Sequence, residues 1–120
     1  MAIPSGSGTE VLKRVTGAVD GATTSVLTVG SDKICTVLSV IICNVNTTNA
    51  CDVYMYARDG SEDREIFQLV AGATGALDKR ATFVWNDKFV LTAGDILKIQ
   101  EDGSGNIEYW VSYIEQDWTT

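Results

Sequence analysis

The sequence predicts an all-β fold: an antiparallel β-sandwich of the jelly-roll or a related Greek-key type, with about eight strands. Short runs rich in Val, Ile, Thr, Tyr and Phe recur about every ten residues, a spacing typical of such folds. Gly, Asp and Asn separate these runs, and no helical periodicity extends beyond one turn. The length of 120 residues suits one domain, so we expect a single β-sandwich domain over residues 9–120.

The first half of the chain opens with residues 1–8, whose Pro, Gly and Ser content predicts a flexible N-terminal arm. Three Val- and Thr-rich runs follow it, and each predicts a strand. They cover residues 9–16, 23–29 and 33–45.

The second half contains the clearest turn signals. Asp59-Gly60 predicts a tight hairpin, because Gly adopts positive φ without strain. The small, Gly-rich segment 71–77 predicts a loop. A helix over residues 76–81 is the alternative, but Gly72 and Gly75 leave no long frame for it. The strands expected in this half cover residues 51–57, 65–70, 81–85, 88–91, 96–100 and 107–115.

The amino-acid composition limits the kinds of partner that this protein can bind. A net charge of −7 argues against direct nucleic-acid binding, which needs clustered Lys and Arg. No apolar run is long enough to span a membrane, and the N-terminus does not resemble a secretion signal, so we expect synthesis and assembly in a cytoplasm. The odd number of cysteines favours free thiols, with a Cys43–Cys51 disulfide as the alternative.

The chain contains no histidine, which removes the usual general base and the commonest zinc ligand. We therefore predict no enzyme activity, no catalytic residue, no metal and no cofactor. Two acidic stretches, starting at Asp102 and Asp59, alternate oxygen-bearing side chains like a calcium loop. Their sixth positions are Ile107 and Arg64, where an EF-hand has Gly, so hairpin turns are the better explanation.

The run KICTVLSVIICN, residues 33–44, is apolar on both alternating faces. One face carries Ile34, Leu38, Val40 and Ile42, and the other carries Cys35, Val37, Ile41 and Cys43. A sandwich strand should have one polar face, so the second face is expected to contact another subunit or a host surface. The alternative is that a loop or the N-terminal segment covers it.

The last strand has a similar pattern, with Trp110 and Ile114 on its second face and Trp118 shortly after it. Tyr and Trp are frequent at the centre of protein interfaces. The candidate interface residues are Val37, Ile41, Trp110, Ile114 and Trp118.

Three stretches, PSGSGTEVLKR, FVWNDKFVLTAGDILKI and VSYIEQDW, resemble small virion structural proteins of tailed bacteriophages, and the resemblance covers most of the chain. It implies a jelly-roll-like sandwich that forms a homo-oligomer, often a trimer, on the virion after assembly in the host bacterial cytoplasm. The preferred role is a capsid decoration or cement protein that binds the major capsid protein. Neck, tail or fibre proteins are the alternatives within the virion.

The arm is expected to anchor the protein to the particle, with Ile3, Pro4 and Ser5 as its candidate residues. A carbohydrate- or ligand-binding β-sandwich module is the alternative function from a different class.

Overall fold

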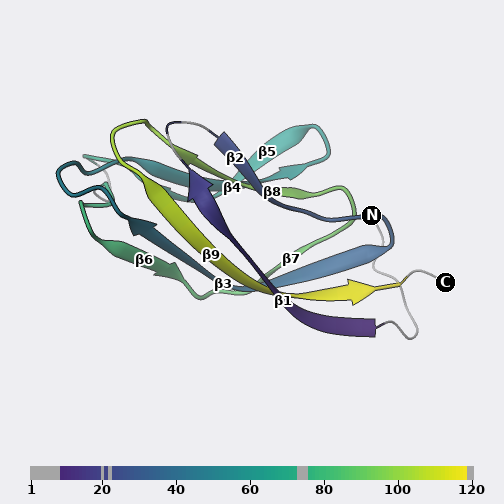
Figure 1. Ribbon diagram of the computed structural model, residues 1–120. Helices are drawn as coiled ribbons and strands as arrows, with labels where there is room; N and C mark the ends of the chain where they lie inside the picture. The colour runs from purple at the N-terminus through teal and green to yellow at the C-terminus, as the bar shows by residue number, and fades with distance from the viewer. Residues whose placement is uncertain (1–8, 20, 22, 73–75, 119–120) are drawn as a thin grey trace.

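The computed structural model describes residues 9–19, 21, 23–72 and 76–118 (Figure 1). Across these residues the chain forms nine strands in two antiparallel sheets that pack face to face. Within the same residues there is no helix of the length and apolar character needed to cross a membrane.

The first sheet has the order β1-β9-β3, with β6 and β7 sharing its far edge. β1 and β9 pair along their whole length, residue by residue from Thr9–Asp117 to Val19–Ile107. The strands of this sheet are β1 (Thr9–Val19), β3 (Lys33–Asn44), β6 (Thr82–Trp85), β7 (Phe89–Leu91) and β9 (Ile107–Asp117).

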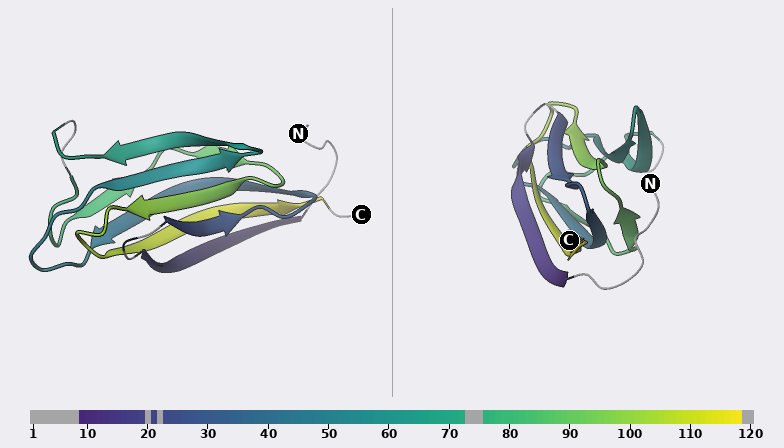
Figure 2. Two further views of the ribbon diagram at one scale, coloured as in Figure 1. Left: turned by 90° about the horizontal axis from the view of Figure 1, so that it is seen from above. Right: turned by 90° about the vertical axis from the view of Figure 1, so that its right-hand side faces the viewer.

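The second sheet has the order β2-β8-β4-β5. Its strands are β2 (Thr23–Thr28), β4 (Val53–Asp59), β5 (Glu62–Leu69) and β8 (Ile96–Glu101). Successive strands cross from one sheet to the other, except at the β4–β5 hairpin and between β6 and β7 (Figure 2). This connectivity is a jelly roll, so the predicted fold class is confirmed.

The chain has nine strands because the strand that pairs with the far side of β3 is interrupted. Residues 40–43 of β3 pair with β6, and residues 35–37 pair with β7. The two short strands therefore occupy successive parts of one sheet edge, separated by residues 86–88. Counted as one broken strand, they give the eight strands of a standard jelly roll.

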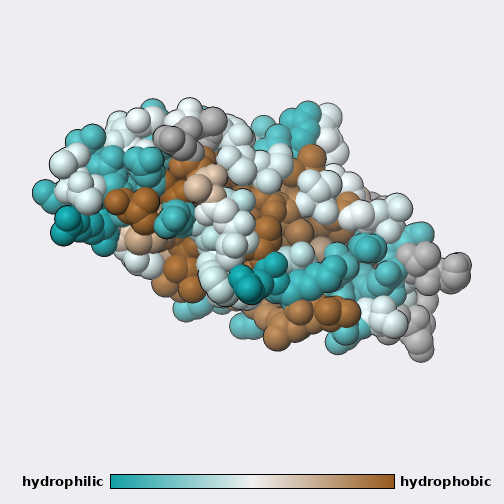
Figure 3. Space-filling view, in the orientation of Figure 1, coloured by the Kyte–Doolittle hydropathy of each residue, from teal (hydrophilic) through white to brown (hydrophobic). Residues whose placement is uncertain are grey.

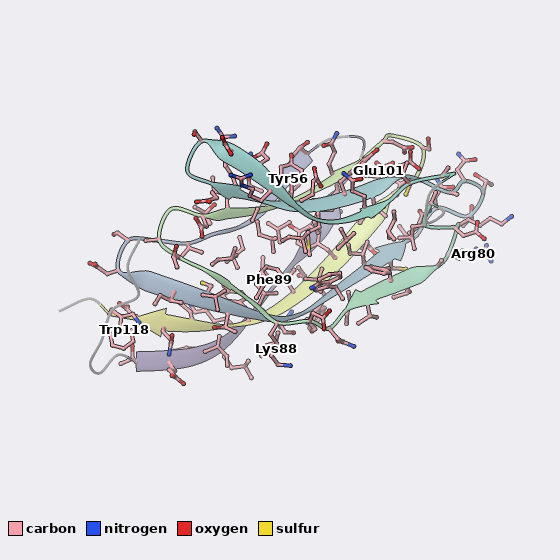
Figure 4. The ribbon with its side chains drawn as sticks, turned by 180° about the vertical axis from the view of Figure 1, so that it is seen from behind. Tyr56, Arg80, Lys88, Phe89, Glu101 and Trp118 are labelled. Carbon is pink, nitrogen blue, oxygen red and sulfur yellow. The ribbon has the colours of Figure 1, made fainter. Side chains whose placement is uncertain are left out.

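The core lies between the sheets and comes from alternate residues of the central strands. Its fully buried aliphatic members include Val37, Val40, Ile42, Val53, Met55, Leu97, Ile99, Ile107 and Val111. Near the β5 and β6 edges, the Phe67 ring lies 4.9 Å from the Phe83 ring and 5.9 Å from the Trp85 ring, centroid to centroid. Phe89 points into the same space between the sheets (Figure 4).

One end of the sandwich closes around the buried carboxylate of Glu101. This carboxylate accepts backbone N–H bonds from Gly21 at 2.6 Å, Gly103 at 2.7 Å and Gly105 at 2.9 Å. It thereby holds the β8–β9 turn against the segment that follows β1.

Asn44, the last residue of β3, is the second fully buried polar side chain at this end. Its Nδ2 donates to the carbonyls of Asn49 at 3.0 Å and Leu77 at 3.2 Å, and its Oδ1 accepts from the Asn46 backbone N–H at 3.1 Å. A Cβ on Gly105 would lie 2.9 Å from Asn44 Oδ1, so the turn approaches this amide too closely for any side chain. Four segments of the chain are therefore tied together at this end.

The three cysteines are free thiols, as the sequence favours. Cys35 and Cys51 are buried, whereas Cys43 is half-buried. Burial raises the pKa of the Cys35 thiol to about 11 and that of the Cys51 thiol to about 12. Both side chains are therefore protonated at neutral pH and act as small apolar core residues.

Candidate functional site

The outward side of the first sheet carries an exposed group of apolar side chains. We call it the outer apolar face, and it comprises Leu12, Leu38, Ile41, Val84, Val90, Trp110 and Ile114. Leu12 is 72% exposed and Trp110 44% exposed, although both lie in regular strands. Part of the apolar surface is visible along β1 at the lower side of the molecule in Figure 3.

Strand register brings these residues together. Opposite residues in a sheet point to the same side, so each cross-strand row shares one face. One row runs across the sheet through Leu12, Ile114, Thr36 and Val90. Another runs through Thr16, Trp110, Ile41 and Val84. Each of these two rows thus contributes three apolar side chains to the outer side of the sheet.

A β-bulge in β3 explains why the strand is apolar on both sides. The pairing of β3 with β9 shifts between Val37 and Ser39, which leaves Leu38 as an extra residue. The bulge reverses the alternation at this point, so residues 35 and 37 before it and 40 and 42 after it all face the core. The strand thus has a continuous apolar inner side, while Leu38 and Ile41 remain outside.

Val37 was expected at the interface, and the structure corrects this expectation. Its side chain is fully buried between the sheets, because the uniform alternation assumed for residues 33–45 does not continue through the bulge. The remaining candidates on the two strands, Ile41, Trp110 and Ile114, lie on the outer apolar face.

Trp118 lies apart from this group. It follows β9 at the end of the sandwich, where its backbone N–H donates to the Asp32 carbonyl at 2.8 Å (Figure 4). Its side chain is half-buried, and its indole N–H is buried without an acceptor among the described residues. The candidate anchoring residues Ile3, Pro4 and Ser5 lie outside the described residues.

A shallow groove of about 680 Å³ crosses the outer apolar face. Its apolar lining comes from Leu12, Leu38 and Trp110, and its other lining residues are Lys13, Arg14, Ser39, Lys88 and Ser112. The guanidinium carbon of Arg14 lies 4.5 Å from the centroid of the Trp110 ring, a cation–π contact. Lys88 points to the outer side of the same sheet (Figure 4).

The charge in this groove is opposite to that of the whole protein. Arg14 and Lys88 contribute positive charge to its lining and no carboxylate lines it, whereas the chain carries a net charge of −7. Lys13 also lines it, but its Nζ is bound to Glu115 on the inner side of the sheet. The groove therefore favours a partner surface that combines apolar and acidic side chains.

The outward side of the second sheet is polar by comparison. Its register rows carry Thr23, Ser25, Tyr54, Gln68, Lys98 and Gln100. Lys98 Nζ lies 5.9 Å from the centroid of the Tyr56 ring, so the lysine side chain covers part of this aromatic surface. The two outer faces therefore differ in polarity, and the apolar one belongs to the first sheet.

The acidic turns considered for calcium are closed by their own hydrogen bonds. The Ser104 backbone N–H donates to Asp102 Oδ1 at 2.9 Å, and Arg58 pairs with Asp63 at 3.3 Å across the β4–β5 hairpin. Gly60 has φ of +64° in this hairpin, as predicted for the Asp59-Gly60 turn. No group of three or more Cys, Asp or Glu side chains within the described residues is placed to hold a metal ion.

A charged cluster lies on the inner side of the first sheet. Lys13 Nζ donates to Glu115 Oε1 at 2.8 Å, and Lys33 Nζ lies 3.6 Å from the same oxygen. The Lys13 hydrogen bond is the largest influence holding the pKa of the Glu115 carboxyl below its ordinary 4.5. The ionised carboxylate is thus favoured in the folded state.

This cluster predicts a pH-dependent contribution to stability. A carboxyl whose pKa is lower in the folded state stabilises the fold above its ordinary pKa, and the effect disappears as pH falls through the lowered value. We expect Glu115→Gln to lower the free energy of unfolding at pH 7 by no more than about 1 kcal/mol, because Lys13 is partly exposed. Urea unfolding of both proteins at pH 7 and pH 3 tests this expectation, which an equal difference at the two pH values would contradict.

Comparisons with known proteins show similarity at the level of the fold. No family model matches the chain, and no curated protein is similar to it in sequence. A solved chain of the acid-stable capsid of Helicobacter pylori bacteriophage KHP30 is 10% identical, with a TM-score of 0.59 over 94% of this chain and 95% of that one.

Two further solved structures are similar over nearly the full length. A chain of Bacillus endospore appendages, described as disulfide-linked pili, is 11% identical with a TM-score of 0.55, covering 99% of this chain and 97% of that one. A chain of the cyanophage Pam1 capsid is 13% identical with a TM-score of 0.50, covering 98% of this chain and 92% of that one. At these identities the comparison establishes a shared fold.

Proposed function

We propose that this chain is a non-enzymatic structural subunit of a bacteriophage particle, which assembles by burying its outer apolar face against another subunit. That face carries the proposal, because exposed Leu, Val and Trp side chains lie together on the outer side of one sheet, whereas the outer side of the other sheet is more polar. Stable subunit interfaces resemble a protein core cut in half, and a central Trp flanked by Arg is typical of their energetic centres.

The fold similarities support a particle subunit. Chains with this fold occur in the KHP30 and Pam1 capsids, and a third occurs in a pilus, so three of the similar structures are assemblies of many subunits. This agrees with the virion proteins that the sequence resembles.

Within the virion we propose a capsid decoration, or cement, role in which the protein binds the major capsid protein and stabilises the head. A small acidic chain suits an accessory that repeats over the capsid lattice. The basic, apolar groove supplies a docking surface on a protein that is otherwise negative. Neck, tail and fibre positions are the alternatives, and the homotrimer expected from the resemblance is one assembly that this face can form.

The solution mass of the purified protein tests the proposal. We expect light scattering to give an oligomeric mass over a wide range of concentrations, because an apolar face of this kind is unfavourable in water. A monomer at every concentration would contradict self-assembly through the outer apolar face. If such a monomer also gave selective hits on a glycan array, the carbohydrate-binding alternative would replace the proposed function.

A further inference from the structure

β1 presents a long sheet edge without a neighbour. One side of β1 pairs with β9, and no strand of the described residues pairs with the other side. The stretch from Thr9 to Arg14 is exposed throughout. Figures 1 and 2 show this edge at the outside of the molecule. A free edge of this length is a template for pairing with another strand.

We propose that two copies of this chain associate by antiparallel pairing of their β1 edges around a two-fold axis at Leu12. The inference rests on the proposed function, because such pairing joins the outer apolar faces of two subunits into one surface. It specifies both the partner, a second copy of the same chain, and the register of the contact.

The register follows from the charges on β1. In an antiparallel self-pair centred on one residue, side chains equally distant from the centre lie opposite each other on the same face. A centre at Leu12 places Glu10 opposite Arg14 of the second copy, twice by symmetry, and Leu12 opposite its own equivalent. The pairing then extends from Thr9 to Val15 within the described residues.

The neighbouring registers lack this match. Centres at Glu10, Lys13 or Arg14 place identical charges directly opposite each other, which is destabilising. With centres at Val11 or Val15, no charged side chain of β1 in one copy lies opposite a charged side chain of β1 in the other. Of the centres from Glu10 to Val15, Leu12 is the one that pairs unlike charges.

Two side-chain contacts with β9 fix the face of the sheet on which the charged groups of β1 lie. Glu10 Oε1 accepts a hydrogen bond from Gln116 Nε2 at 2.8 Å, and Arg14 lies over the Trp110 ring. Both contacts keep the two charged groups on the outer side of the sheet, beside Leu12. Leu12, the most exposed large apolar side chain of the described residues, would be covered by its equivalent in the second copy.

An engineered disulfide tests the register directly. In a Cys43→Ser background, Leu12→Cys should form a covalent dimer under mild oxidation, because opposite Cα atoms in a sheet lie about 5 Å apart. The matched control is Thr16→Cys, on the same face and strand. Its two copies would be offset by about eight residues, or about 27 Å along the strand, and should not cross-link.

Charge reversal provides an independent readout that needs no new covalent bond. Glu10→Arg and Arg14→Glu should each weaken dimerisation by about tenfold, because each places like charges opposite each other twice. The double variant, Glu10→Arg with Arg14→Glu, restores unlike pairs and should recover the dissociation constant, measured by analytical ultracentrifugation. If the double variant dimerised more weakly than either single variant, with the two losses of affinity adding up, the proposed register would be wrong.

The outcomes separate this inference from the proposed function. A stable oligomer that does not cross-link through residue 12, including a trimer, overturns β1 pairing while the outer apolar face remains the assembly surface. A monomer at every concentration that also fails to cross-link overturns both. Cross-linking at residue 12 but not at residue 16, together with recovery in the double variant, supports the two-fold contact.

Discussion

Replacing Glu101 by Gln is expected to destabilise the fold by about 2–4 kcal/mol, the largest effect that we predict for an isosteric change. The carboxylate accepts three backbone N–H bonds, two of them at one oxygen. An amide keeps only one acceptor oxygen and directs an NH₂ group at N–H donors. At least one buried donor is then left without a partner. Urea unfolding at pH 7 measures the loss.

Glu108→Gln is the matched control, because it removes the same charge from an exposed position on the outer side of β9. It should change the free energy of unfolding by less than about 0.5 kcal/mol. Glu101→Asp provides a second comparison, since its carboxylate is one methylene too short to reach all three N–H groups. If Glu101→Gln were as stable as Glu108→Gln, the turn would not depend on this carboxylate.

Replacing Trp110 by Glu is expected to weaken association through the outer apolar face by about 100-fold or more. Loss of an aromatic side chain from the centre of an interface costs about 2–4 kcal/mol, and the substitution also places a carboxylate in an apolar contact. The indole is exposed in the isolated chain, so the free energy of unfolding of one subunit should change by only about 1 kcal/mol. Light scattering over a dilution series measures the change in association.

The control for Trp110→Glu is Gln100→Glu, which adds the same charge to the exposed outer face of the second sheet. It should leave the mass unchanged at every concentration. Equal weakening by both variants would indicate a general effect of net charge on this acidic protein. Unchanged association of Trp110→Glu would exclude the outer apolar face as the interface.

Sequence reasoning failed within β3 because of one inserted residue. Alternation of apolar residues fixes which side chains share a face only while the pairing is regular, and a bulge reverses the sides of all later positions. Leu38 is that extra residue, and nothing in the letters TVLSV marks it. Val37 was therefore assigned to the outer side, whereas Ile41, beyond the bulge, does lie there.

For other members of the outer apolar face, the surrounding sequence gives little indication that the side chain is exposed on a shared surface. Leu12 lies in the polar run TEVLKRVT, and Val84 and Val90 occupy short strands whose alternation covers only a few residues. Each reads as an ordinary strand residue when taken alone. They form one surface only because β1, β9, β3 and the β6–β7 edge lie side by side.

The position of Glu101 in the sequence carries a detectable signal of its role. An acidic residue directly before the turn Asp102–Gly105, with glycines at 103 and 105, is suited to accept exposed backbone N–H groups. The third donor, Gly21, lies far away in the sequence and is brought close only by the fold.

The sequence by itself determined the fold class, the approximate positions of the strands and the Asp59-Gly60 hairpin. These features depend on local preferences, since β-branched and aromatic runs form strands and Gly allows the turn conformations between them. The tertiary structure alone decided the strand order, the bulge, the outer apolar face and the unpaired edge of β1. They depend on contacts between residues far apart in the chain, whose register no local pattern contains.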